Sequence, residues 1–197
     1  MKKFLFLSLA LILLLTSSVA AAKTPVRIAR LPIIFKSTVP DYDTRAELEM
    51  KIARAAHIPL NNTLKVAEFL PTKDSTAALD EIWQKMRAEN KKARLKDAMR
   101  PLAEKLNADI VICPILLRYS QFVDNFSGFD ETYVSSNARA ELIVYDRRND
   151  NLVGKKASQM YHGAISTIGT VDYLAKICFE KVIDDTKLRK LIMAVGK

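Results

Sequence analysis

Apolar and polar residues alternate along residues 133–145, which is the period of a strand with one buried face. The apolar set is Val134, Ala138, Ala140, Leu142 and Val144. The run Asn149-Asp150-Asn151 follows, and such residues tolerate tight turns. Residues 152–162 then fit the return strand. The pattern predicts an antiparallel hairpin.

Three other stretches repeat apolar residues every three or four positions, which is typical of amphipathic helices. The three sets are Leu79, Ile82, Trp83 and Met86; Leu95, Ala98, Met99, Leu102, Ala103 and Leu106; and Val171, Leu174, Ala175, Cys178, Phe179, Val182 and Ile183. Asp74 or Ser75 is the expected N-cap of the first. Pro101 predicts a kink or a fresh helix start within the second. Residues 186–195 should form a short final helix.

An earlier helix is predicted from Thr44-Arg45-Ala46-Glu47, which fits a capping box. It carries Leu48, Ile52 and Ala55 on one face, and Pro59 stops it. Strands are expected at residues 26–35, 64–70 and 110–123, the last being the most apolar. The predicted order is β-α-β-α-α-β-β-β-α, in a single α/β domain over residues 23–197 with a mixed β-sheet and packed helices.

The first 22 residues fit a secretory signal peptide rather than part of the fold. Two lysines precede a 12-residue apolar run, and small residues ending in Ala20-Ala21-Ala22 follow it. The run is short for a bilayer core of roughly 30 Å, which needs about 20 helical residues, although an uncleaved anchor stays an alternative. No cysteine follows the run to accept a lipid. The mature protein is therefore expected to be exported, periplasmic or extracellular, with no transmembrane segment.

Three stretches of the chain resemble the exported α/β domain shared by the curli-secretion protein CsgG, the penicillin-binding-protein activator LpoB and the N-terminal domain of TolB. They are Arg27-Ile28-Ala29-Arg30-Leu31-Pro32, Leu106-Asn107-Ala108-Asp109-Ile110-Val111-Ile112 and Glu141-Leu142-Ile143-Val144-Tyr145-Asp146. The resemblance implies a binding and assembly module of the cell envelope with no catalytic residues. Two features depart from the family: the missing lipid-acceptor cysteine and the lack of a candidate for the pore's barrel strands.

Positive charge is concentrated between residues 85 and 100. The chain carries a formal charge of +9, and this stretch holds seven Lys or Arg against Glu89 and Asp97. A solvated helix junction would explain it. The functional interpretation is a patch, with Lys91, Lys92 and Arg94 as contact candidates, that meets an anionic envelope polymer, lipid headgroups or an acidic protein. Export argues against nucleic acid as the partner.

A second candidate contact surface is aromatic. Phe122, Phe126 and Phe129 lie within eight residues around Gly128. Exposed aromatic side chains of this kind more often mark a protein contact than catalysis, although the rings could instead fold back over the sheet as a lid. Asp124, Asp130 and Glu131 in the same stretch do not have the spacing of an EF-hand loop.

Two cysteines, Cys113 and Cys178, are present. In an oxidising compartment they could form a disulfide, yet both also fit small buried hydrophobic residues.

No G-x-G-x-x-G, P-loop, H-E-x-x-H or G-x-S-x-G motif occurs, so we expect neither cofactor, metal nor catalytic residue. The expected function is a non-enzymatic binding module for a protein or an anionic surface. The alternative is a small exported hydrolase or ligand-binding enzyme, which would need a cleft of roughly 300 Å³ or more lined by converging His, Asp or Ser groups.

Overall fold

The computed structural model describes residues 24–125 and 132–195, which form one α/β domain around a mixed six-stranded sheet. Its strands run in the order β3-β1-β4-β5-β6, and β2 pairs with β4 off this path. Strand β1 (Val26–Arg30) lies parallel to both β3 (Ala67–Phe69) and β4 (Ile110–Asn125). The two long strands β5 (Thr132–Asp146) and β6 (Asn151–Ala164) form the antiparallel hairpin that the alternation predicted. Strand β5 also pairs antiparallel with β4, which completes a meander.

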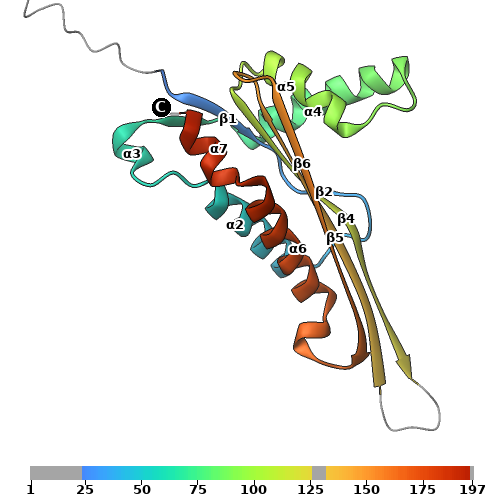
Figure 1. Cartoon of the computed structure of the whole chain (residues 1–197). Coiled ribbons are helices and arrows are strands. Elements are labelled where there is room, and N and C mark those ends of the chain that lie inside the picture. Colours follow the sequence, from blue (N-terminus) through green and yellow to red (C-terminus); the bar gives the residue numbers. More distant parts are fainter. Residues whose placement is uncertain (1–23, 126–131, 196–197) are drawn as a thin grey trace, which may run out of the picture.

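Helices cover the two faces of the sheet unequally (Figure 1). One face packs against α2 (Tyr42–Ala56), α6 (Val171–Thr186) and α7 (Leu188–Val195). The other packs against α4 (Thr72–Glu89), the 3₁₀ turn η1 (Leu95–Ala98) and α5 (Met99–Lys105). The predicted apolar stripes lie on the packed sides of these helices, because each must bury its apolar face against the sheet.

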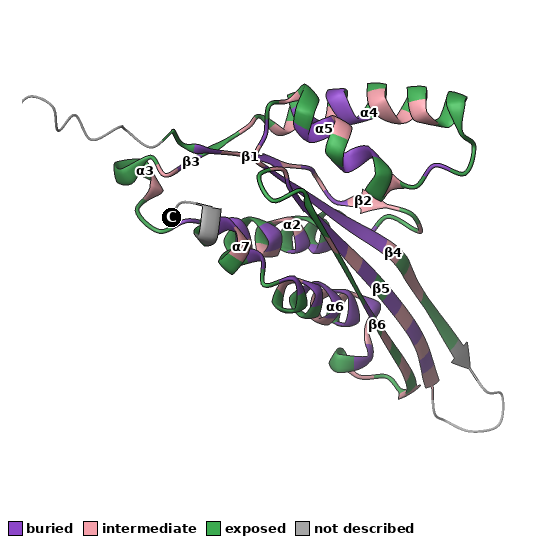
Figure 2. Ribbon diagram, turned by 45° about the horizontal axis from the view of Figure 1, so that its top comes forward, coloured by how far each residue is buried: buried purple, intermediate pink, exposed green. Residues whose placement is uncertain are grey.

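Strands β4, β5 and β6 continue well past α4 and α5, as an arm that we define as residues 118–123, 133–139 and 158–164 (Figure 2). On one side α6 and the short turn η2 (Thr167–Gly169) follow the strands, and Ala138 is fully buried there. On the other side no described helix covers the arm, and Phe122 and Met160 are 66% and 75% exposed. The arm therefore has one buried face and one bare face.

The predicted strand 26–35 is wrong as a single element, since it is divided into β1 and β2 (Ile34–Phe35). Pro32 between them has no N–H to donate. The next amide, Ile33 N, donates to the Glu49 carboxylate at 2.6 Å instead of to a strand. Because of this break, the segment pairs with β4 as two separate short strands.

The strand predicted at 64–70 is also shorter, and a helical turn, α3 (Asn61–Leu64), precedes it. The Asn61 side chain both donates to the carbonyl of Ala67 and accepts from its N–H, each at 2.8 Å. Lys65 takes a left-handed conformation with φ 46°. These contacts fold the segment into a tight turn, and they depend on a residue six positions away.

Two predicted helix caps are wrong. Helix α2 begins earlier, because Asp41 Oδ1 accepts from Thr44 N at 2.9 Å. The Thr44 hydroxyl instead donates to Asp172 on α6, at 3.1 Å. At α4, neither Asp74 nor Ser75 caps the helix, which begins after Pro71, and the Ser75 hydroxyl donates to the Pro71 carbonyl. Pro101 lies in the first turn of α5, so the fresh helix start is confirmed.

The disulfide alternative is wrong, since Cys113 and Cys178 are both free. Each is fully buried, but in a different core: Cys113 with the residues under α4 and α5, and Cys178 with those under α6. The sheet lies between the two thiols. Both therefore act as small buried hydrophobes, the other interpretation that their sequence context allowed.

Candidate functional site

A groove of about 750 Å³ lies on the sheet face beside the end of α4, where the arm emerges from the helices. Six separate segments line it: the residue after β2, the second half of α4, the residues around the start of η1, and parts of β4, β5 and β6. The lining residues are Lys36, Trp83, Arg87, Ala93, Arg94, Leu95, Lys96, Ile115, Leu117, Glu141, Ile143, Leu152, Gly154, Lys155 and Lys156.

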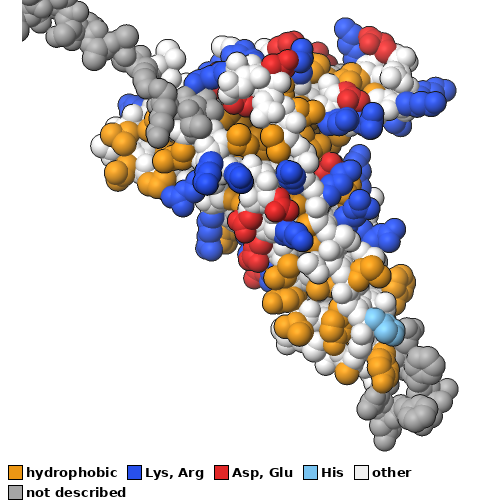
Figure 3. All heavy atoms as spheres, viewed as in Figure 1, with side chains coloured by type: hydrophobic (Ala, Val, Ile, Leu, Met, Phe, Trp, Pro, Cys, Tyr) orange, Lys and Arg blue, Asp and Glu red, His pale blue; other side chains and the backbone are white. Residues whose placement is uncertain are grey.

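The groove combines an apolar floor with a cationic rim. Ile115 and Ile143 are buried in its floor, and Gly154 contributes no side chain above Ile143, its neighbour across the β5–β6 ladder. Around them stand six cationic residues, Lys36, Arg87, Arg94, Lys96, Lys155 and Lys156. Figure 3 shows Lys and Arg side chains gathered below α4 and along the upper part of the strands.

Carboxylates are scarce in this groove. Glu141 is the one acidic residue of its lining, and it pairs with Lys156 at 3.5 Å. The other five cations have no ion pair with any described residue, whereas Arg30, Lys51, Arg100 and Lys105 elsewhere do. The nearby Asp97 accepts from the backbone N–H of Arg94 at 2.9 Å, so its carboxylate is held by the turn. The groove therefore has a strongly positive potential.

Trp83 holds two of these cations in place. The Lys36 ammonium lies 5.8 Å from the indole centroid and the Arg87 guanidinium 5.7 Å. Such cation–π contacts restrict flexible side chains without neutralising their charge. Arg87 is further fixed by donating to the carbonyl of Lys91 at 2.9 Å. The indole is thus a positioning group for the rim of the groove.

The sequence-predicted candidates are only partly brought together here. Arg94 lines the groove, while Lys91 and Lys92 are exposed in the connection between α4 and η1 and do not line it. Phe122 is on the arm, and Phe126 and Phe129 lie outside the described residues. Sequence reasoning missed Lys36, Trp83, Lys155 and Lys156. Of these four residues, only the adjacent lysines at 155–156 gave a sequence signal for a basic site.

The chemistry of the groove does not provide a nucleophile with a base. Neither His57 nor His162 lines it. Among residues 24–125 and 132–195, no group of three or more His, Cys, Asp and Glu residues could hold a metal ion. Burial raises the pKa of the Cys113 thiol to about 12 and of Cys178 to about 11, far above neutrality. The converging groups are cations, which bind anions rather than activate water.

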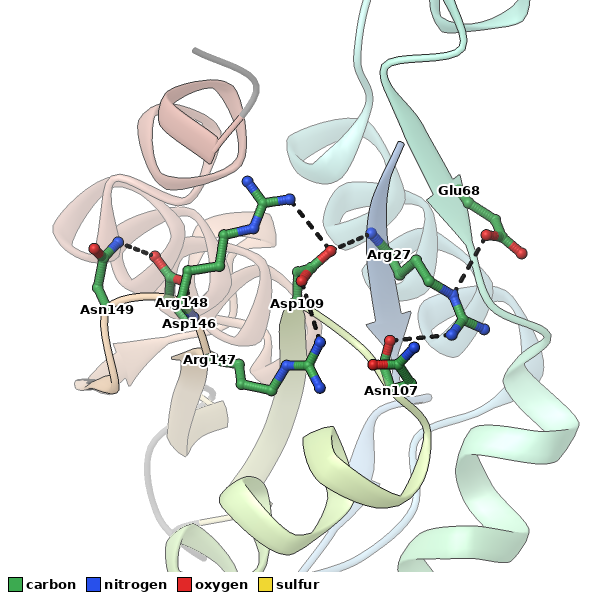
Figure 4. Close-up of polar contacts among 8 residues, drawn as sticks. All are labelled: Arg27, Glu68, Asn107, Asp109, Asp146, Arg147, Arg148 and Asn149. Atoms are coloured by element: carbon green, nitrogen blue, oxygen red, sulfur yellow. Dashed lines mark hydrogen bonds and ion pairs between the residues drawn. The ribbon is translucent and has the colours of Figure 1, made fainter. Parts of the chain in front are cut away.

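A separate polar cluster at the opposite end of the sheet is structural (Figure 4). Asp109 accepts from the backbone N–H of Arg27 at 2.9 Å and from the guanidinium groups of Arg147 and Arg148 at 3.4 and 3.3 Å. Burial would raise the pKa of this carboxyl, but these donors outweigh it and hold the pKa below its ordinary value. Asp109 thereby ties β1, the start of β4 and the β5–β6 turn together.

Comparison with known proteins does not assign this chain to a family. No family model matches the chain, and no curated protein matches it in sequence. Several solved structures have a similar fold at low identity. A hypothetical protein of Chlamydia trachomatis is 13% identical with a TM-score of 0.44, covering 86% of this chain and 99% of its own. A lipoprotein of Neisseria meningitidis is 17% identical with a TM-score of 0.38, covering 83% and 99%.

The C-terminal domain of LpoB from Salmonella enterica is also among these structures, at 9% identity and a TM-score of 0.33, covering 74% of this chain and 89% of the domain. At such values the likeness carries no functional argument. The resemblance to CsgG and TolB remains a prediction from the sequence. Within the part of the chain that the structure describes, no helix has the length and apolar character to cross a membrane.

Proposed function

We propose that this protein is an exported, non-enzymatic module of the cell envelope that binds an anionic partner in the basic groove. The observation that carries the proposal is the imbalance of charge: six cations and one carboxylate around an apolar floor, with five of the cations free of ion pairs to described residues. Like charges held close together repel one another, so an anionic ligand relieves this repulsion when it binds.

Export is the second part of the proposal and is supported by the signal-like residues 1–22. It favours partners of the envelope, an anionic polymer or an acidic protein surface, over nucleic acid. The alternative, a small exported hydrolase, called for a cleft with converging His, Asp or Ser groups. The groove has the volume but a different lining, in which Glu141 is the single carboxyl group and is paired with Lys156.

Removing two groove cations tests the proposal. We expect the double variant Arg94→Gln/Lys96→Gln to bind labelled dextran sulfate at least about tenfold more weakly than the native protein, because each lost charge-assisted contact weakens binding by about that factor. The affinity of the native protein should also fall steeply as salt is raised, since salt screens exposed charges. Fluorescence titration at two ionic strengths measures both effects.

The matched control is Arg189→Gln/Lys190→Gln on α7. This helix packs on the opposite face of the sheet, and the change removes the same amount of charge from two exposed cations. The control should bind like the native protein. Equal losses in both double variants would mean that net charge, rather than the groove, attracts the probe, and the proposal would be wrong.

The aromatic residues Phe122, Phe126 and Phe129 remain a proposed protein-contact surface, favoured by the 66% exposure of Phe122 on the bare face of the arm. Phe122→Ser should change the free energy of unfolding by no more than about 0.5 kcal/mol, as for other exposed positions. It should reduce capture of a partner from envelope extract. A marked fall in melting temperature with unchanged capture would show that the ring stabilises the fold instead.

A further inference from the structure

Two arginines face each other on the arm just beyond the groove. Arg118 of β4 and Arg139 of β5 are direct partners in the antiparallel ladder, and both are exposed. Neither guanidinium group forms an ion pair or hydrogen bond with any described residue. Like charges directly opposite on a sheet destabilise it. The repulsion between the two arginines destabilises the fold locally, and an anion bound between them would remove that repulsion.

A β-bulge places Arg118 on the bare face. The register of β4 against β5 shifts between Leu116 and Arg118, with Leu117 as the extra residue. Leu116 lies in the core under α6, so regular alternation would point Arg118 toward that same face. With the bulge, Arg118 instead shares the face of its partner Arg139. Bulges commonly re-aim a side chain in this way next to binding sites.

The arginine pair lies next to the groove along the direction of the strands. Arg139 is two residues from Glu141 on β5, and Leu117, the bulge residue beside Arg118, lines the groove. Residues two apart on a strand share a face and are separated by about 7 Å. The cationic surface therefore extends from the groove along the strands to Arg118 and Arg139, where no described helix covers the arm (Figure 1).

Beyond the arginines this face is rich in neutral hydrogen-bonding groups. Ser158 of β6 lies directly opposite Arg139, and Ser120 and Asn137 form the next pair along this face. None of the described residues between the groove and Phe122 on this side is acidic. The side chains of Ser and Asn can both donate and accept hydrogen bonds. A ligand that fits this face would therefore carry hydroxyl groups as well as anionic groups.

From these observations we infer that the site takes a linear acidic polysaccharide, which lies along the groove and continues over the arm with an anionic group between Arg118 and Arg139. The inference deepens the proposed function and rests on it. Anionic groups in a linear chain match a row of cations along strands, and sugar hydroxyls match Ser120, Asn137 and Ser158.

A length series of heparin-derived sulfated oligosaccharides tests this inference by calorimetric titration. The disaccharide probes the groove alone, and the octasaccharide can reach the arm. We expect the octasaccharide to bind at least about tenfold more tightly. In Arg118→Gln/Arg139→Gln the octasaccharide should lose that advantage, while the disaccharide binds as before. The melting temperature of this variant should be equal or higher, because the repulsion between the two arginines is gone.

The outcomes separate the two proposals. If the disaccharide binds in an Arg94-dependent manner but length and the arm arginines make no difference, the extended site is wrong and the groove stands. If polyglutamate binds in an Arg94-dependent manner and neither oligosaccharide does, the polysaccharide site is wrong and the groove stands; if none of these probes binds, both proposals are wrong. Polyglutamate of matched charge tests whether the site prefers a polysaccharide to an acidic peptide. If polyglutamate binds as tightly as the octasaccharide and its binding depends equally on Arg118 and Arg139, the ligand is an acidic peptide and the assignment to a polysaccharide is wrong.

Discussion

Replacing Leu102 with alanine should lower the free energy of unfolding by about 2–5 kcal/mol. Leu102 on α5 is fully buried in the core between α4, α5 and the sheet, together with Val111 and Cys113 of β4. Removing its side chain leaves a cavity, because the surrounding side chains belong to several packed elements and cannot all shift to fill it. Urea denaturation of the native protein and the variant measures the difference.

Leu106→Ala is the matched comparison on the same helix stripe. Leu106 is the C-cap residue of α5 and is only partly buried, although the sequence pattern placed it in the core equally with Leu102. Its replacement should therefore cost clearly less. Equal losses for the two variants would show that the end of α5 is as tightly packed as its middle, contrary to the structure.

Replacing Asp109 with asparagine should lower the free energy of unfolding near neutral pH by about 1.5–3 kcal/mol. The substitution keeps the size of the side chain but removes the negative charge with which Asp109 pairs with Arg147 and Arg148. The carboxylate is only 15% exposed, so water replaces this interaction poorly. A fall of that size, with an unchanged dependence on urea concentration, would confirm that the cluster is a structural tie between β1, β4 and the β5–β6 turn.

The pH dependence of the same variant gives an independent test. Because the pKa of Asp109 is lower in the folded protein than its ordinary value of 3.8, its contribution is complete above that value. It is lost as the pH falls through the lowered pKa. The native protein should thus lose its advantage over Asp109→Asn between about pH 4 and more acidic conditions. A difference that stays constant down to about pH 2 would contradict this account.

The sequence was sufficient for the elements whose pattern is long and regular. The alternation through residues 133–145 and the apolar stripes of α5 and α6 predicted the right elements, because each of these has to bury one face. Ile143 and Tyr145 alternate with the predicted apolar set, so the pattern places them on the exposed side of the hairpin. They are buried because α4 and α5 cover that face of the sheet near its base, and a single strand's period carries no information on a second layer.

The errors concern contacts between residues far apart in the sequence. Thr44 is a good N-cap by its local spacing, yet its hydroxyl is used by Asp172 on another helix, and Asp41 takes the cap. Likewise Glu49 holds the amide of Ile33 and ends the first strand early. Local propensity could not reveal either contact.

The candidate site was predictable only in part for the same reason. The dense positive charge around Arg94 was visible in the sequence, but the groove also needs Lys36 and Trp83 from earlier in the chain and Lys155 and Lys156 from β6. These residues meet because β4, β5 and β6 pass under the end of α4. The bulge at Leu117 was equally hidden, since a bulge is defined by the partner strand rather than by the strand itself.

The placement of the two thiols has a consequence for how the chain matures. Cys113 and Cys178 are buried on opposite sides of the sheet, so the one intramolecular disulfide that this sequence permits is incompatible with the folded state. An unfolded chain in an oxidising compartment has both thiols accessible, and an oxidase that joined them would trap a chain unable to close its sheet. In such a compartment folding and oxidation would compete, and burial of β4 and α6 would withdraw both thiols from oxidation.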